Sequence, residues 1–182
     1  MQTSAGLHPG LTGAWTLADE VRRELLASIV GLSPIQWAFR PNPTTWSIGE
    51  IVEHLLLSEI GSSKMVRKLI RGDYANTPFP EGATLFGAGL DRYPYGSLEA
   101  PPALVPGSPR HRTIVESELA SARERLRQEL ARFQGDDPEA LRSPDPATGE
   151  WFTLGGWVRL HAGHERHHVG QIRRLMGTAG FP

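Results

Sequence analysis

Histidine is the residue type in this sequence that is best suited to chemistry. The chain has seven histidines, and His161, His164, His167 and His168 lie within one stretch of eight residues. A neutral imidazole binds ions such as zinc through a ring nitrogen. Because the sequence contains no cysteine, any metal site in it must use nitrogen and oxygen ligands. The cluster therefore indicates a metal site held largely by imidazoles.

The spacing of the clustered histidines favours one pair. Residues four apart on a helix lie on the same face, so His164 and His168 can bind one ion together. His161 and His167 also lie about one turn from His164, and spacing alone does not make the choice unique. His161 and His168 are separated by about 10.5 Å of helix rise, which is too far to share an ion easily. We expect His167 to pack or to face solvent, with orientation of the substrate as the alternative.

A third ligand is needed to complete such a site, and His54 is the candidate. It is the only other histidine on the apolar face of a predicted helix. Metal sites in helix bundles are built from side chains of facing helices. We therefore predict a site formed by His54, His164 and His168, with at least one position open to water or substrate. His8 and His111 are expected at the surface.

The same segment also fits the zinc-protease motif H-E-x-x-H, with Glu165 in the place of the general base. Such proteases take a third ligand further along the chain, and residues 169–182 contain no histidine, aspartate or glutamate. The extended motif has glycine three residues after the second histidine, where this sequence has Gln171. These departures argue against a zinc protease.

Four helices must position these side chains. Apolar residues recur every three or four positions over about residues 15–31, 48–71, 112–133 and 153–176. Ser47 and Glu50 form a capping-box pattern at the start of the second helix. The arginines and glutamates of the third helix are expected to be solvated, and Gly61 in the second is expected either to allow close packing or to leave space.

The connections between these helices are predicted to be irregular. Segment 73–109 is rich in proline and glycine, which interrupt helices and strands, and an irregular segment of this length suits a lid or binding loop. Residues 134–150 have the composition of turns, and no stretch alternates convincingly as a strand. We predict an all-α four-helix bundle, with a long Pro/Gly-rich loop between helices two and three, as one domain over residues 1–182.

Composition narrows the possible partners. The formal net charge is −1, so no overall positive field favours nucleic acid or an anionic membrane. No window approaches the length of a transmembrane helix, and the first residues do not resemble a signal peptide. These features predict a cytoplasmic protein that binds neither nucleic acid nor membranes.

Two segments resemble the DinB-like superfamily, which includes damage-inducible proteins and bacillithiol- or mycothiol-dependent transferases. They are the proline-rich turn leading into the helix of His54 (PNPTTWSIGEIVEHL, residues 41–55) and the last helix around its histidines (HERHHVGQI, residues 164–172). The resemblance implies a four-helix bundle, often a homodimer, in which His54, His164 and His168 hold a divalent metal ion, commonly zinc or nickel. It does not specify the reaction.

The sequence thus predicts a metal-dependent enzyme that activates water or a small thiol for a small-molecule substrate. Because the chain has no cysteine, a thiol nucleophile would have to come from a low-molecular-weight cosubstrate. The activity would be that of a hydrolase or of a thiol S-transferase. The alternative is a non-catalytic, stress-related bundle that binds a structural ion.

Overall fold

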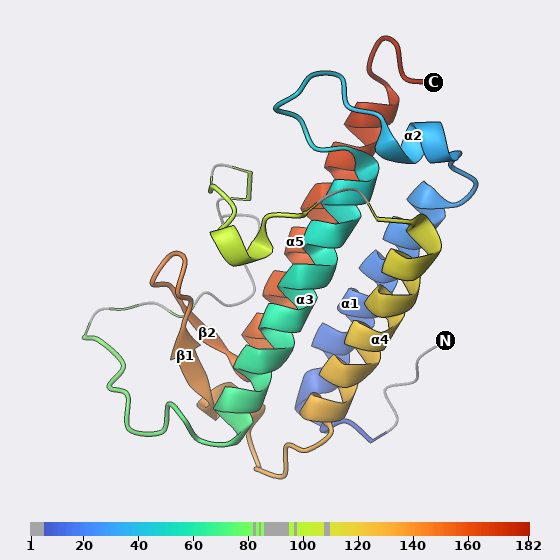
Figure 1. The fold of residues 1–182 in the computed structure, drawn as a ribbon. Helices are drawn as coiled ribbons and strands as arrows, with labels where there is room; N and C mark the ends of the chain where they lie inside the picture. Colours follow the sequence, from blue (N-terminus) through green and yellow to red (C-terminus); the bar gives the residue numbers. More distant parts are fainter. Residues whose placement is uncertain (1–5, 82, 84, 86–94, 97, 108–109) are drawn as a thin grey trace.

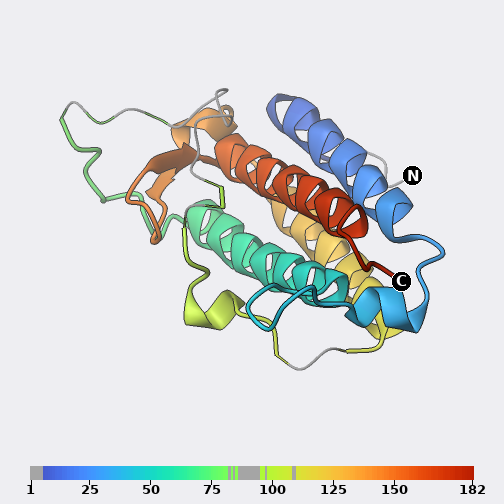
Figure 2. The ribbon, with the colours of Figure 1, turned by 90° about the horizontal axis from the view of Figure 1, so that it is seen from above.

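A computed structural model describes residues 6–81, 83, 85, 95–96, 98–107 and 110–182. Its four long helices form a bundle (Figure 1). They are α1 (Pro9–Ile29), α3 (Ile48–Ile70), α4 (Arg112–Leu130) and α5 (Leu154–Met176). Helix α5 packs on both α1 and α3, and α4 packs on α3. Seen from above, α5 lies between α1 and α3 (Figure 2).

The predicted capping box fixes the start of α3. The Glu50 amide donates to the Ser47 hydroxyl at 3.3 Å, and the Ser47 amide donates to the Glu50 carboxylate at 2.9 Å. Two amides without intrahelical partners are thereby satisfied at the end that leads to His54. Helices α3, α4 and α5 begin within one residue of the predicted positions, whereas α1 begins earlier than expected, at Pro9.

Two small elements were not expected from the sequence. Helix α2 (Pro34–Ala38) starts with a capping box between Ser33 and Gln36, in a segment for which the sequence analysis predicts no helix. Strands β1 (Arg142–Pro144) and β2 (Trp151–Thr153) pair antiparallel directly before α5. With three residues each, these strands are too short to show alternation, so the expectation of no strands was wrong here.

The apolar core is divided into two clusters along the bundle. One contains residues such as Val21, Val66, Leu126 and Ala162, around one half of the four helices. The other occupies the opposite half and contains, among others, Leu25, Leu56, Ala122 and Val169.

The described part of the chain includes no helix that is both long and apolar enough to cross a bilayer.

Candidate metal centre

The three histidines predicted as ligands converge between α3 and α5. The Nε2 atom of His164 lies 3.1 Å from Nε2 of His54 and 3.0 Å from Nε2 of His168. One ring nitrogen from each residue falls within 4.8 Å of the other two. Among the described residues this group has three members and includes no carboxylate. His54 and His168 are buried, and His164 is half-buried.

Hydrogen bonds on the outer side of two rings determine which nitrogen faces inward. Nδ1 of His54 donates to the carbonyl oxygen of Leu104 at 2.8 Å, and Nδ1 of His168 donates to the side-chain oxygen of Gln171 at 2.7 Å. In a neutral imidazole the second nitrogen is then an acceptor. Both Nε2 atoms therefore present lone pairs to the centre, and neutral His164 has at most one proton to share between them.

This donor set fits a divalent cation. At least one inward lone pair has no proton, which is costly in a buried position and is resolved by a bound cation. Two ligands about 2.05 Å from an ion at the tetrahedral angle stand about 3.3 Å apart. The observed Nε2 separations of 3.1 and 3.0 Å are close to this value.

Burial keeps these imidazoles neutral. It lowers the pKa of His54, against the opposing hydrogen bond to the Leu104 carbonyl. Burial, reinforced by the neighbouring imidazoles, lowers the pKa of His164 well below 6.5 and that of His168 to about 3. The nitrogens are therefore ready to bind a cation at neutral pH without first losing protons.

The metal-free protein should lose stability as the pH falls. The pKa of His168 is lower in the folded chain, about 3, than its ordinary value of 6.5, so below pH 6.5 the unfolded chain binds the extra proton. The urea midpoint of chelator-treated protein should therefore decrease as the pH falls from about 6.5 toward 3. His168→Gln should flatten this dependence, whereas His111→Gln, at an exposed position, should not. Equal slopes for both variants would contradict the assignment.

Aromatic side chains surround the three histidines. The Trp46 ring lies 5.0 Å from that of His54. Tyr95 stacks on His164 and His167 at 6.0 and 5.8 Å, and its hydroxyl donates to the Leu160 carbonyl at 3.0 Å. Tyr95, like Leu104, belongs to the Pro/Gly-rich segment 73–109. Two residues of this segment, Tyr95 and Leu104, thus contact the site. Residues 82, 84, 86–94, 97 and 108–109 of the segment lie outside the described residues.

The other histidines have different surroundings. His167 is half-buried and packs against Tyr95, which is one of the placements left open by the sequence. His161 is buried, and its Nε2 has no hydrogen-bond partner among the described residues. His111 is exposed, as expected. His8 is not a plain surface residue, because its Nδ1 caps α1 at the Gly10 amide and its ring packs edge-on against Phe133.

Glu165 does not act as the base of a zinc protease. It is completely buried, and its carboxylate accepts hydrogen bonds from Arg22 at 2.5 Å and from Arg123 at 2.9 Å. A carboxylate held in this way has no access to a water molecule at the histidine cluster.

The same arrangement also corrects the prediction for the third helix, because Arg123 is buried rather than solvated. Gly61 leaves space, since among the described residues a Cβ there would meet no atom within 4 Å apart from its chain neighbours and the backbone of its own helix.

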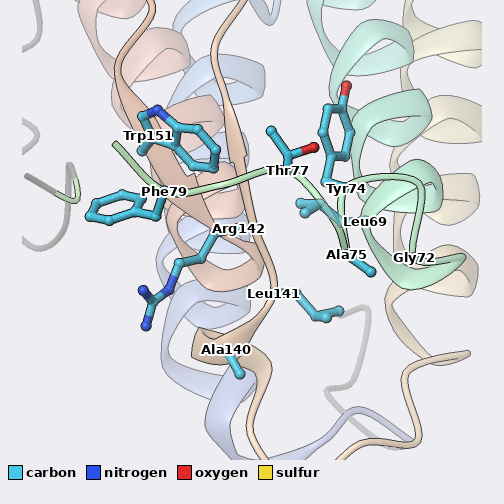
Figure 3. A pocket seen from close by; sticks show the side chains of 10 residues that line it. All are labelled: Leu69, Gly72, Tyr74, Ala75, Thr77, Phe79, Ala140, Leu141, Arg142 and Trp151. Carbon is cyan, nitrogen blue, oxygen red and sulfur yellow. The ribbon is translucent and has the colours of Figure 1, made fainter. Parts of the chain in front are cut away.

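A separate pocket lies away from the histidines. It has a volume of about 230 Å³ and is formed by the end of α3, residues 72–79 and the strands β1 and β2. Figure 3 shows Phe79 and Trp151 at one side of it, with ring centroids 5.2 Å apart and edge-on, and Arg142 below Phe79. None of the three clustered histidines lines this pocket.

Comparisons with known proteins agree with this architecture. The sequence model of the DinB superfamily matches residues 17–172. The uncharacterised protein YuaE of Bacillus subtilis (strain 168) is 26% identical over 165 residues, which cover 88% of this chain and 95% of YuaE.

Two solved structures share the fold. TT2238, a four-helix bundle protein, superposes with a TM-score of 0.60 at 22% identity, over 89% of this chain and 97% of TT2238. YfiT from Bacillus subtilis, described as a probable metal-dependent hydrolase with an unusual four-helix bundle topology, gives 0.59 at 18% identity, over 93% of this chain and 87% of YfiT. The match of the family model across most of the sequence is the decisive finding: the chain belongs to the DinB superfamily.

Proposed function

We propose that this protein is a metal-dependent hydrolase of small molecules, in which His54, His164 and His168 hold one divalent ion. The observation that carries the proposal is the set of inward-facing Nε2 atoms, two of them fixed as acceptors by the Leu104 carbonyl and by Gln171. The description of YfiT, a protein of the same fold, as a probable metal-dependent hydrolase supports it. Zinc and nickel both suit an imidazole donor set.

Each part of the site has a distinct task in this proposal. Three neutral imidazoles add no negative charge, so the full positive charge of the ion acts on whatever occupies its open position. An ion in such a site lowers the pKa of a coordinated water or thiol toward neutrality. Leu104 and Gln171 keep the rings in the binding tautomer. Trp46 and Tyr95 cover the rings and limit the access of bulk water.

Thiol S-transfer is the second candidate. The absence of cysteine means that the sulfur would come from a low-molecular-weight thiol bound at the same open position. Homodimerisation and a cytoplasmic location remain predictions. A closed coordination shell with four protein ligands would favour the alternative of a non-catalytic bundle. Among the described residues, no fourth histidine, aspartate or glutamate joins the cluster.

Activity should depend on the metal. We expect chelator-treated protein to be inactive against a panel of small esters, amides and lactones, and activity to return with zinc or nickel. His54→Ala, treated in the same way, should stay inactive. A second assay with a small thiol and alkyl electrophiles, such as epoxides and alkyl halides, separates the two candidates. Only S-transfer consumes the thiol and forms a thioether, as the epoxide ring opens or the halide leaves. Undiminished turnover by metal-free protein would contradict the proposal.

A further inference from the structure

The bundle holds a second polar cluster that the proposed chemistry does not use. It consists of one charged side chain from each long helix, namely Arg22 of α1, Glu59 of α3, Arg123 of α4 and Glu165 of α5. Glu59 and Glu165 are 0% exposed, Arg123 is 2% exposed and Arg22 is 8% exposed. We call these four residues the charged layer. Its two carboxylates and two guanidinium groups balance in charge.

Each arginine of the charged layer donates hydrogen bonds to one carboxylate of α3 and one carboxylate of α5. Arg22 donates to Glu59 at 2.7 Å and to Glu165 at 2.5 Å. Arg123 donates to Glu59 at 2.5 Å and to Glu165 at 2.9 Å. Both guanidinium groups therefore bridge a carboxylate of α3 to a carboxylate of α5. A shift of one helix along the other would break these bonds together.

The charged layer lies at the junction of the two apolar clusters. Along α1, Arg22 falls between Val21 of one cluster and Leu25 of the other. Along α5, Glu165 falls between Ala162 and Val169, which again belong to different clusters. Apolar contacts alone specify helix register weakly, because neighbouring registers bury similar area. A buried charge that loses its partner in a shifted register is costly.

The same two helices carry the metal centre. Glu165 directly follows His164 on α5, and Glu59 stands about 7.5 Å of helix rise beyond His54 on α3. His161, one turn before His164 and Glu165 on α5, lies beside the layer, with Nε2 at 3.6 Å from Glu59 and 3.8 Å from Glu165. A change in the α3–α5 register at the charged layer is thus transmitted to the His54–His164 separation through less than two helical turns.

We propose that the charged layer positions the metal ligands: it sets the register of α3 against α5 and so holds His54 opposite His164 and His168. This inference rests on the proposed metal site. The four residues are positioning residues that do not touch the ion or the substrate. Buried ion pairs contribute little net stability compared with well-packed apolar residues, so specificity of register is the role that accounts for them best. Arg22 and Arg123 outweigh the effect of burial and hold the pKa of Glu59 at about 2, so this carboxylate stays charged at neutral pH.

The test separates affinity from stability. Cobalt(II) is titrated into metal-free protein at a temperature where circular dichroism shows a fully folded chain, and its visible spectrum reports the ligand geometry. Glu59→Gln and Glu165→Gln should bind cobalt at least about 10-fold more weakly, as expected when groups that support the ligands are lost. Glu129→Gln is the matched control, because its ion pair with Arg67, at 3.1 Å, also joins α3 to α4 but is partly exposed. It should bind like the unmodified protein.

A quadruple variant, Arg22→Met, Glu59→Leu, Arg123→Met and Glu165→Leu, replaces the layer with apolar side chains. It should keep or raise the melting temperature, yet bind cobalt at least about 10-fold more weakly with an altered spectrum. A folded quadruple variant with unchanged affinity and spectrum overturns the inference and leaves the proposed function intact. If the unmodified protein takes up no cobalt, the proposed function fails, and this inference fails with it.

Discussion

His164→Ala should remove nearly all specifically bound metal from the protein. His164 lies between the other two ligands, with its Nε2 at 3.1 Å from that of His54 and 3.0 Å from that of His168. Its loss removes the central ligand and leaves only two nitrogens for the ion. Structural zinc sites bind with about 10–16 kcal/mol over four ligands, or roughly 3 kcal/mol for each. Affinity should therefore fall by about 100-fold or more.

His167→Ala is the matched control for this variant. His167 lies on the same helix, stacks on the same tyrosine and has its ring 5.3 Å from that of His168, but it is not part of the ligand cluster. Elemental analysis after dialysis should find one metal ion per chain in His167→Ala and almost none in His164→Ala. Equal metal contents in the two variants would show that the cluster has been assigned wrongly.

Arg123→Met should destabilise the fold strongly. Arg123 donates to Glu59 and Glu165, and its guanidinium lies over the Trp15 ring at 5.7 Å from the centroid. Removing it leaves two fully buried carboxylates to share Arg22. Breaking a buried ion pair in this way costs about 3–5 kcal/mol in the free energy of unfolding. Urea denaturation of the metal-free protein measures this change.

Arg127→Met provides the comparison on the same helix. Arg127 stands one turn after Arg123 and pairs with Glu124 at 2.8 Å, near the protein surface. Exposed pairs of this kind contribute little, so the urea midpoint should stay close to that of the unmodified protein. Similar urea midpoints for both variants would mean that removing Arg123 leaves no costly unpaired charge in the interior.

The sequence could predict that His54, His164 and His168 come together, because each of the signals involved is local. The His164–His168 spacing places both rings on one helical face, and the capping box of Ser47 and Glu50 marks where the helix of His54 begins. Helix periodicity then brings all three to the interior. The structure brings the three rings together, and metal binding by them stays a prediction.

The supporting parts of the site could not be predicted in the same way. Leu104 acts through its backbone carbonyl, which carries no residue-specific signal. Arg123 and Glu59 lie in helices that contain other charged residues, and periodicity does not reveal which charged position a neighbouring helix covers. Strands β1 and β2 were missed because pairing across a turn, rather than a pattern within either segment, creates them.

That residues 1–182 form one domain stays a prediction, which limited proteolysis can test.

X-ray absorption spectroscopy of the metal-loaded protein tests the central claim most directly. After reconstitution with zinc or nickel and removal of excess ion, we expect one ion per chain. Its extended X-ray absorption fine structure should fit three imidazole nitrogens, at about 2.0–2.1 Å for zinc. Additional light-atom scattering should come from the ligand at the open position. A protein that retains no ion, or an ion whose spectrum lacks imidazole scattering, would contradict the account.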